Sequence, residues 1–430
     1  MPRLRPLTLL ATLLTLFTLY TLHNHLLPTP FTHKPSSPPL HPLPLSCPTH
    51  ALLNNILVVL KTGVTESRTK VPIHLTTTLR CIPNYAIFSD YIEPLTPTLS
   101  THDVLSSLSP ALIAQNPDFD LYRRVHAAGP SALTPADLNP DTNTPIGKPN
   151  NPGWKLDKWK FLPMLETALA VKPDAEWYVF MEADTFIVWE NLLRWLERFD
   201  TSEKWYLGNQ MQIVDAIFAH GGSGFILSRP AVEAAVERRK MSSDGWERAV
   251  MEHWAGDCML GLLLEDAGVP LTWAWPMVQI APPGEMDYFS RGYEKRPWCY
   301  PVVSFHHLDA RGVAELEGLL GGSGKGGVVL WRDVFLEMVR PQVQSVRMGW
   351  DNLADGDVVE VKSFAACRGV CVREALCLQY RFNETDGSCA TSKLLMVGRG
   401  AADVASGWMT ERIDAVAGSL GECREVSWIG

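Results

Sequence analysis

Short apolar runs alternate with amphipathic stretches along most of this chain. The run Trp177–Met181 is aromatic and β-branched, which predicts a buried strand. Apolar periodicity predicts helices at Asp157–Val171, 189–199 and 230–239, and a threonine-rich helix at 66–82. Further short strands are expected at Ile56–Leu60, Tyr85–Phe88, Trp205–Gly208, Phe225–Leu227 and Val302–Phe305. Alternating strands and helices predict an α/β fold with a mostly parallel sheet, and the polar residues 100–153 are expected to form surface loops.

Two acids follow the most apolar strand directly. Glu182 and Asp184 are spaced i, i+2, and Thr185 comes next. Ligands collect at the carboxyl ends of strands in α/β proteins, and carboxylate oxygens there suit Mg²⁺ or Mn²⁺ holding phosphates. The alternatives are a solvated turn, or a helix N-cap in which Asp184 and Thr185 cap the following helix.

Three later segments add candidate chemistry, and each has a structural alternative. The glycines at Gly221, Gly222 and Gly224 allow a ligand close to the backbone, or they form a tight turn. Asp257 begins a predicted helix, as an N-cap or as a general base. His306 ends a predicted strand, where a histidine completes a metal site or serves only in packing.

The N-terminus predicts a membrane anchor. Arg3 and Arg5 precede an uncharged, mostly apolar stretch that extends to Leu27, long enough to span a bilayer with the basic end in the cytosol. A cleaved signal peptide is the alternative, but no small-x-small cleavage pattern follows. Residues 28–46 are rich in proline and form an expected stem.

Composition and cysteines fit a globular protein in an oxidising compartment. The 46% of hydrophobic residues permit a large core, and the net charge of −9 argues against nucleic-acid binding. Nine cysteines include Cys367, Cys371, Cys377 and Cys389, whose spacing favours disulfides over zinc and leaves the connectivity open. An odd total leaves at least one thiol free or paired between chains. Asn383 begins an N-glycosylation sequon.

Taken in order, these segments resemble the fringe and core-1 β1,3-galactosyltransferase branch of glycosyltransferase family 31. The resemblance spans roughly residues 52–310. The matching segments are Lys61–Gly63, Phe88–Asp90, Trp177–Val188, Glu190–Leu192, Gly221–Ser228, Gly256–Gly261 and Val303–His306. The chain departs from the family at Glu182, where relatives usually carry aspartate, and at Gly256, where they usually carry an acid.

The resemblance implies a GT-A (Rossmann-like) fold, a UDP-sugar donor and inversion at the anomeric carbon. It implies Glu182, Asp184 and His306 as ligands of a divalent metal, Mn²⁺ or alternatively Mg²⁺, and Asp257 as the catalytic base. The residues that it places around the nucleotide sugar are Lys61, Thr62, Asp90, Ala183, Gly221 and Gly222. The expected reaction transfers a galactose- or N-acetylglucosamine-type sugar, in a β1,3 linkage, to a glycan or glycoprotein. The alternative is a non-catalytic lumenal lectin or chaperone.

The C-terminal cysteines, with Leu378–Tyr380 between them, resemble a PAN/apple module. Such a module would hold the acceptor, or it would only cap the catalytic domain. The expected organisation is a tail and anchor at 1–27, the stem at 28–46, the glycosyltransferase domain at 47–345 and the module at 346–430. This organisation predicts a type II Golgi membrane protein whose catalytic domain lies in the lumen. Among the fifteen tryptophans, most are expected in the core, and Trp298 is the one singled out for stacking on a sugar.

Overall fold

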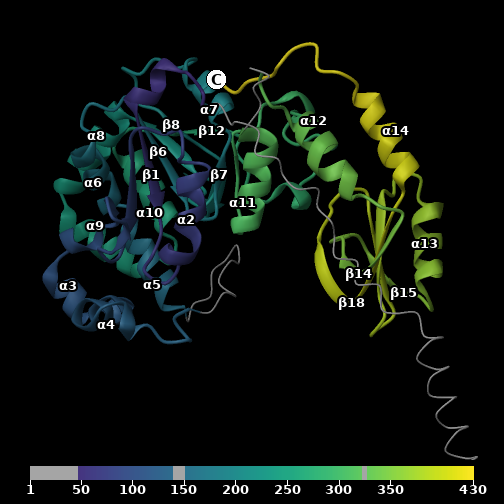
Figure 1. The fold of residues 1–430 in the computed structure, drawn as a ribbon, viewed down its shortest axis with the longest axis horizontal. Helices are drawn as coiled ribbons and strands as arrows, with labels where there is room; N and C mark the ends of the chain where they lie inside the picture. The colour runs from purple at the N-terminus through teal and green to yellow at the C-terminus, as the bar shows by residue number, and fades with distance from the viewer. Residues whose placement is uncertain (1–46, 139–150, 322–326) are drawn as a thin grey trace, which may run out of the picture. The chain divides into compact units, whose positions relative to one another are not determined.

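The computed structural model describes residues 47–138, 151–321 and 327–430 (Figure 1). The predicted anchor and stem lie outside the described residues, as does most of the glycine-rich segment 321–327. The described residues all belong to one compact unit. Across the described ranges, the helices are too short or too polar to cross a bilayer.

A seven-stranded sheet forms the centre of this unit, in the order β12-β8-β11-β6-β1-β2-β5. Neighbouring strands are parallel except at β11, which runs antiparallel to both β6 and β8. The strands are β1 Ile56–Lys61, β2 Tyr85–Ser89, β5 His102–Asp103, β6 Trp177–Glu182, β8 Tyr206–Gly208, β11 Phe225–Ser228 and β12 Leu271–Trp273. The predicted mixed α/β architecture with a mostly parallel sheet is confirmed.

Helices cover both faces of the sheet, so its central strands are buried on both sides. In β1, Leu57 and Val59 face one apolar cluster, while Ile56, Val58 and Leu60 face another. The first cluster is built with α4 Asp120–Ala128, α5 Pro152–Lys160, α6 Pro163–Val171, α8 Arg229–Lys240, α9 Ser243–Glu252 and α10 Gly256–Asp266. The second is built with α2 Ser67–Thr76 and α7 Trp189–Leu196. Such two-sided burial explains the continuous apolar runs of these strands.

Two local predictions were wrong. The expected helix Asp157–Val171 is two helices, because Pro163 opens α6 and cannot donate the hydrogen bond that a continuous helix requires. The expected loop region 100–153 contains α3 Pro110–Gln115 and α4. In α4, Leu121, Tyr122 and Val125 are buried at helical spacing, a signal that the polar composition around them obscured.

Short antiparallel pairs extend the sheet domain. β9 Gln210–Ile213 pairs with β10 Ala216–Ala219, and β7 Phe186–Ile187 pairs with β13 Ser304–Phe305. A two-stranded pair of β3 Pro94–Thr96 and β4 Leu99–Ser100 follows β2. The β7–β13 pair matters most for the site, since it brings His306 beside the acids that follow β6.

The C-terminal part is a second sheet, in the order β14-β18-β16-β17-β15, and it is antiparallel throughout. Its elements are β14 Val346–Asp351, β15 Val358–Glu360, α13 Phe364–Arg373, β16 Gln379–Asn383, β17 Ser388–Ser392, β18 Arg399–Trp408 and α14 Thr410–Leu420. Disulfides join Cys367 to Cys389 and Cys371 to Cys377, which confirms the disulfide prediction. Asn383 is partly exposed at the end of β16.

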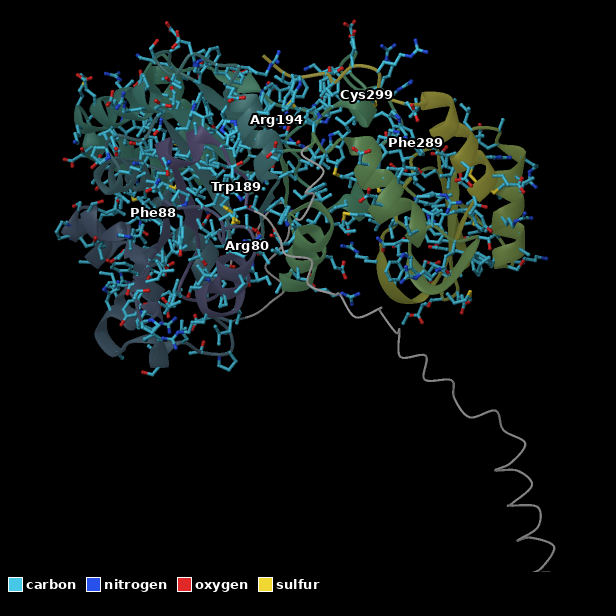
Figure 2. The ribbon with its side chains drawn as sticks, turned by 45° about the horizontal axis from the view of Figure 1, so that its top comes forward. Arg80, Phe88, Trp189, Arg194, Phe289 and Cys299 are labelled. Carbon is cyan, nitrogen blue, oxygen red and sulfur yellow. A yellow bond between two sulfur atoms is a disulfide. The ribbon has the colours of Figure 1, made fainter. Side chains whose placement is uncertain are left out.

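One apolar cluster joins the β7–β13 pair to the C-terminal sheet. It contains Phe289 and Phe335 with Trp408 and Ile413, and it includes residues of α11 Ala310–Leu316 and α12 Trp331–Val334. A third disulfide, between Cys299 and Cys423, crosses the same region, where Figure 2 labels Phe289 and Cys299.

Two further cysteines and one free thiol complete the set. Cys47 is joined to Cys81, and Cys258 is a buried free thiol, as expected from the odd total. At the far end of the chain, the carbonyl of Ile429 accepts a 2.7 Å hydrogen bond from Trp195 Nε1, so the last residues pack on α7.

Candidate active site

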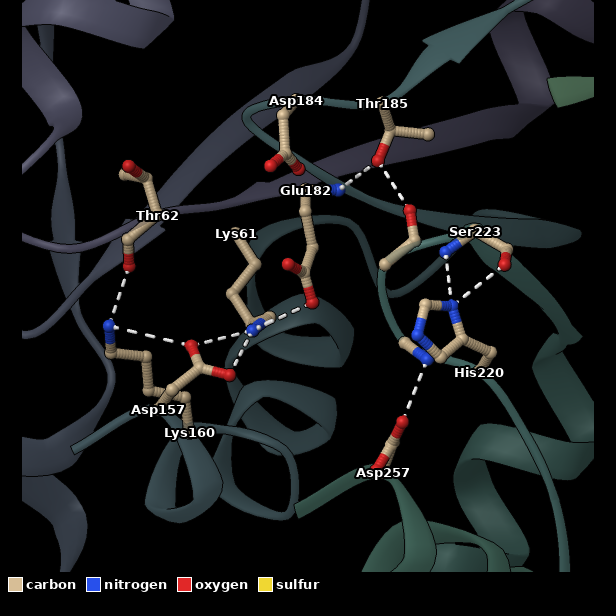
Figure 3. A network of polar contacts seen from close by, with 12 residues as sticks. Lys61, Thr62, Asp157, Lys160, Glu182, Asp184, Thr185, His220, Ser223 and Asp257 are labelled. Carbon is tan, nitrogen blue, oxygen red and sulfur yellow. Dashed lines mark hydrogen bonds and ion pairs between the residues drawn. The ribbon is translucent and has the colours of Figure 1, made fainter. Parts of the chain in front are cut away.

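The carboxyl ends of β1 and β6 place two charged residues side by side. Lys61 and Glu182 are register partners on these parallel strands, and Lys61 Nζ lies 3.0 Å from Glu182 Oε1. The same ammonium contacts Asp157 of α5 at 2.5 Å (Figure 3). Burial would lower the pKa of Lys61, but Asp157 and Glu182 outweigh it and hold the pKa above its ordinary value. Lys61 therefore stays a cation between two carboxylates.

Lys160 and Asp90 form a second buried ion pair. Lys160 Nζ lies 2.8 Å from Asp90 Oδ2 and donates to the carbonyl of Thr62 at 2.7 Å. Asp90 Oδ1 accepts from the backbone of Val64 at 2.9 Å. The contacts of Asp90 and Thr62 thus hold the turn after β1 in place. Neither residue lines the pocket described below.

Asp184, His306 and His307 form a cluster whose ligand atoms lie within 4.8 Å of one another. His306 Nε2 is 3.2 Å from Asp184 Oδ1, and Lys70 Nζ is 3.4 Å from Asp184 Oδ2. Burial would raise the pKa of Asp184, but the neighbouring His306 and Lys70 lower it well below its ordinary value. Asp184 is therefore an ionised carboxylate inside the protein.

The donor atoms of this cluster fit a divalent metal. Nδ1 of His306 and Nδ1 of His307 are buried without a hydrogen-bond partner, and His306 Nε2 has only the 3.2 Å contact with Asp184. Buried polar atoms without partners are rare and call for an explanation such as an ion. One carboxylate and two imidazoles form a donor set that suits a first-row divalent ion. A possible metal site at Asp184, His306 and His307 is thus present, and Glu182 lies outside it.

Glycines bring a loop against these groups. A Cβ on Gly222 would lie 2.2 Å from the His306 ring, and one on Gly221 would lie 2.7 Å from the Phe161 ring. Thr185 Oγ1 donates to the carbonyl of Gly222 at 2.6 Å and accepts from the backbone of Glu182 at 3.1 Å. The helix cap considered for Asp184 and Thr185 is absent, because Val188 precedes α7 without a side-chain cap.

Asp257 faces the same loop from the first turn of α10. Its Oδ2 accepts from the backbone of Gly221 at 3.0 Å, and its Oδ1 accepts from Cys258 at 2.9 Å. Ala255, rather than Asp257, is the N-cap residue. Burial raises the pKa of Asp257 to about 6, although these two hydrogen bonds oppose the shift. A carboxylate with this pKa is a stronger base than an exposed aspartate and is still mostly ionised at neutral pH.

Histidine 220 completes the polar loop as a neutral group. Its Nδ1 accepts from the backbone of Ser223 at 3.1 Å and lies 2.8 Å from the Ser223 hydroxyl. Burial, together with the nearby His306, lowers the pKa of His220 to about 3. His220 therefore carries no charge at neutral pH and positions the glycine loop.

One pocket of about 230 Å³ joins these groups. Of the residues predicted from the sequence, it is lined by Glu182, Asp184, Gly222, Asp257 and His306. Lys61, Thr62, Asp90, Ala183 and Gly221 lie behind its wall, and Ala183 accepts a 2.9 Å contact from His74 through its carbonyl. Trp298 is also outside it, buried against Phe289 and Phe335.

The sequence did not indicate several of the residues that line this pocket. They are His307, Lys70, Asp157, Phe161 and Trp254. The adjacent histidines were a usable signal for His307. No pattern in the sequence indicated that α5 would bring Asp157 and Phe161 to the ends of β1 and β6.

A larger pocket of about 560 Å³ lies elsewhere, beside the Cys47–Cys81 disulfide. Arg80, Trp189 and Arg194, labelled in Figure 2, line it. Arg194 pairs with Glu190, and Arg80 lies 3.6 Å from Glu317. The lining of this pocket includes no predicted site residue, so its size alone does not make it the active site.

Gly256, where the resemblance leads one to expect an acid, has a packing explanation. A Cβ there would lie 2.6 Å from the backbone of Lys158 and 2.5 Å from the Phe161 ring. The close approach of α10 to α5 excludes a side chain at this position, and this packing holds Asp257 at the pocket.

Comparison with known families gives a match over part of the chain. Residues 160–277 match the family described as Fringe-like, a stretch that holds β6, the acids, the glycine loop and Asp257. Lys61, Asp90 and His306 lie outside the matched residues, and the C-terminal module is not covered. Residues 160–277 are thus similar to a Fringe-like domain, a similarity that suggests a glycosyltransferase.

Proposed function

We propose that this chain is a metal-dependent, inverting glycosyltransferase. It moves a galactose- or N-acetylglucosamine-type sugar from a UDP-sugar to a glycan or glycoprotein, forming a β1,3 linkage. The observation that carries the proposal is the single pocket lined by both the Asp184–His306–His307 cluster and Asp257. The Fringe-like match supports the same reaction class.

The metal site and the nucleotide diphosphate belong on one wall of the pocket. Asp184, His306 and His307 would hold Mn²⁺, since two imidazoles favour a transition ion over Mg²⁺. When bound, the ion supplies Lewis-acid stabilisation of the negative charge that develops on the leaving diphosphate. Lys70 and Lys160 also line the pocket, where Lys70 pairs with Asp184 and Lys160 pairs with Asp90.

Asp257 performs the proton transfer in this proposal. The acceptor hydroxyl attacks the anomeric carbon, the new C–O bond forms, and the bond from that carbon to the diphosphate oxygen breaks. The hydroxyl proton passes to the Asp257 carboxylate, whose raised pKa suits a general base near neutral pH. A single displacement from the face opposite the leaving group inverts the anomeric configuration.

Lys61 and the glycine loop position these groups. Lys61 holds the carboxylates of Glu182 and Asp157 at the pocket wall, and the three side chains together carry a net charge of −1. The sequence-based role of Glu182 as a metal ligand would require its carboxylate to leave Lys61. Gly221 and Gly222 let the loop approach His306 and Phe161 closely, and Gly221 orients Asp257.

The proposal includes a place in the cell. We place the chain in the Golgi membrane as a type II protein with the catalytic domain in the lumen. Four disulfides and the sequon at Asn383 are consistent with an oxidising, glycosylating compartment. For the C-terminal module, the cluster shared with the sheet domain supports the role of a stabilising cap.

Release of UDP tests the proposal. The purified chain, made in a secretory host, is incubated with a panel of UDP-sugars, with and without Mn²⁺. We expect Mn²⁺-dependent release from UDP-galactose or UDP-N-acetylglucosamine. A folded protein that binds UDP and Mn²⁺ but releases none with any donor or acceptor offered would support the non-catalytic lectin or chaperone instead.

A further inference from the structure

The lining of the pocket contains two unlike sets of side chains. One set, the charged wall, comprises Glu66, Lys70, Asp184, Glu182 and His306. The other set, the apolar wall, comprises Trp154, Met211, Ile213, Phe218 and Trp254. The proposed function assigns a role to the charged wall and leaves the apolar wall without one.

The register of the β9–β10 hairpin explains why its apolar residues gather on this wall. Met211 is the cross-strand partner of Phe218, and Ile213 is the partner of Ala216. Because side chains alternate along a strand, these four share one face, while Gln210 and Gln212 point away. Met211, Ile213 and Phe218 all line the pocket.

Trp254 supplies an aromatic surface that is fixed and yet open. Its ring is nearly parallel to Trp154 (24°) and to His253 (11°), with both centroid separations at 6.1 Å. Lys158 donates to the carbonyl of His253 at 3.1 Å, and Ala255 donates to His253 Nδ1 at 3.0 Å. Trp254 nevertheless remains 48% exposed. A large aromatic ring held in place and left open to solvent is typical of a binding surface.

Trp254 is also close to the proposed base along the chain. Ala255, Gly256 and Asp257 follow it directly, and all four residues line the same pocket. A ligand resting on Trp254 would therefore occupy the same pocket as the Asp257 carboxylate. The acceptor in the proposed reaction needs this placement, because its hydroxyl must lie within hydrogen-bond reach of the base.

We propose that Trp254, Trp154 and Met211, with the buried Phe218 packed behind Met211, form the acceptor subsite, and that the three solvent-accessible side chains bind the pyranose ring of a glycoside through its apolar C–H face. A pyranose offers such a face together with hydroxyls at its edge, which matches an aromatic surface beside a carboxylate. This inference rests on the proposed function for its orientation toward Asp257. The binding surface itself depends only on the geometry of the apolar wall.

The test measures glycoside binding directly, apart from turnover. Methyl glycosides of galactose, N-acetylglucosamine, N-acetylgalactosamine, glucose and fucose are titrated by saturation-transfer NMR, with UDP and diamagnetic Mg²⁺ present. The variants are Trp254→Ala, Trp154→Ala and the conservative Trp254→Phe. Trp273 and Trp275 provide a matched control, because they form a second stacked pair (6.0 Å, 30°) outside this pocket.

We expect at least one glycoside to bind the wild-type chain. Trp254→Ala and Trp154→Ala should raise the Kd of this glycoside at least tenfold, and Trp254→Phe should raise it less. Trp273→Ala should leave it within twofold. Circular dichroism melts check that each variant is folded.

Three results would overturn the inference. These are unchanged glycoside affinity in Trp254→Ala, loss of affinity in Trp273→Ala instead, and no binding of any glycoside to a wild-type chain that binds UDP. The last would point to an apolar peptide or lipid acceptor.

Calorimetric titration of UDP with Mn²⁺ separates this failure from failure of the proposed function. A chain that binds glycosides through Trp254 but does not bind UDP would retain the subsite and lose the transferase assignment.

Discussion

The sheet domain and the C-terminal module achieve stability in different ways. The central sheet is buried between two large apolar clusters, and one disulfide, Cys47–Cys81, lies within its domain. The module has a small cluster of its own, in which four of the six fully buried members are the cysteines Cys367, Cys371, Cys377 and Cys389. Small units bury less surface per residue and rely more on cross-links.

The difference shows where functional groups can be tolerated. Buried charges and unpartnered imidazole nitrogens are costly, and they occur together at the ends of β1 and β6. Only the part of the molecule with a large core has stability to offset that cost. The cross-linked module has no comparable cluster among its described residues, which fits a structural role.

The largest expected effect comes from removing the base. Asp257→Asn should lower UDP release in the presence of acceptor by about 10²–10⁴-fold, since the carboxylate can no longer take the proton. Steady-state UDP release measures it, and UDP affinity measured by calorimetry should change little. Asp244→Asn, on the exposed start of α9, is the control. Unchanged UDP release by Asp257→Asn would show that Asp257 is not the catalytic base.

Opening a module disulfide should act on stability rather than on the site. Cys367 and Cys389 are separated by 22 residues, so replacing both by serine should cost about 3 kcal/mol of unfolding free energy. Denaturant unfolding measures the loss, and UDP affinity of the folded variant should be retained. Loss of UDP affinity with an unchanged unfolding midpoint would place the module in the active site.

Two glycine-to-alanine changes sharpen the contrast. Gly222→Ala forces a Cβ into the His306 ring and should weaken Mn²⁺-dependent UDP binding at least tenfold. Gly369→Ala, inside α13, meets only the end of Arg373 at 3.5 Å and should stabilise the module by about 0.5–1 kcal/mol. Calorimetry and thermal melts test the pair. Equal UDP affinities in both variants would show that the loop does not control the cluster.

The smallest expected effect is the pH dependence. Because the pKa of Asp257 is raised to about 6, the ionised base is depleted as pH falls through that value. The value of kcat/KM should therefore drop about tenfold per pH unit below 6. UDP–Mn²⁺ affinity measured over the same range corrects for titration of the metal cluster. A profile that stays flat down to pH 5 would contradict the assignment.

Much of the sheet followed from the sequence, because buried parallel strands are continuous apolar runs that few other elements imitate. The helices were less predictable where proline divided one, at Pro163, and where a polar segment concealed another, at α4. Of the residues expected at strand ends, Lys61, Thr62 and Asp90 do not line the pocket. Asp184, Asp257 and His306 do lie at one pocket.

The partners of these residues were not predictable. Glu182 and Asp184 are two residues apart, yet Glu182 contacts Lys61 while Asp184 contacts His306. That division depends on the register of β1 against β6 and on the position of α5, neither of which is encoded locally. The role of Glu182 as a metal ligand stays a prediction, and His307 entered only with the structure.

The central claim is that the Asp184 cluster binds the donor and Asp257 acts on the acceptor. Asp184→Ala tests it most directly, with Mn²⁺-dependent UDP binding and UDP release measured on the same folded protein. We predict that both are lost, whereas Asp257→Asn loses only release. Full UDP binding and turnover in Asp184→Ala would contradict the account.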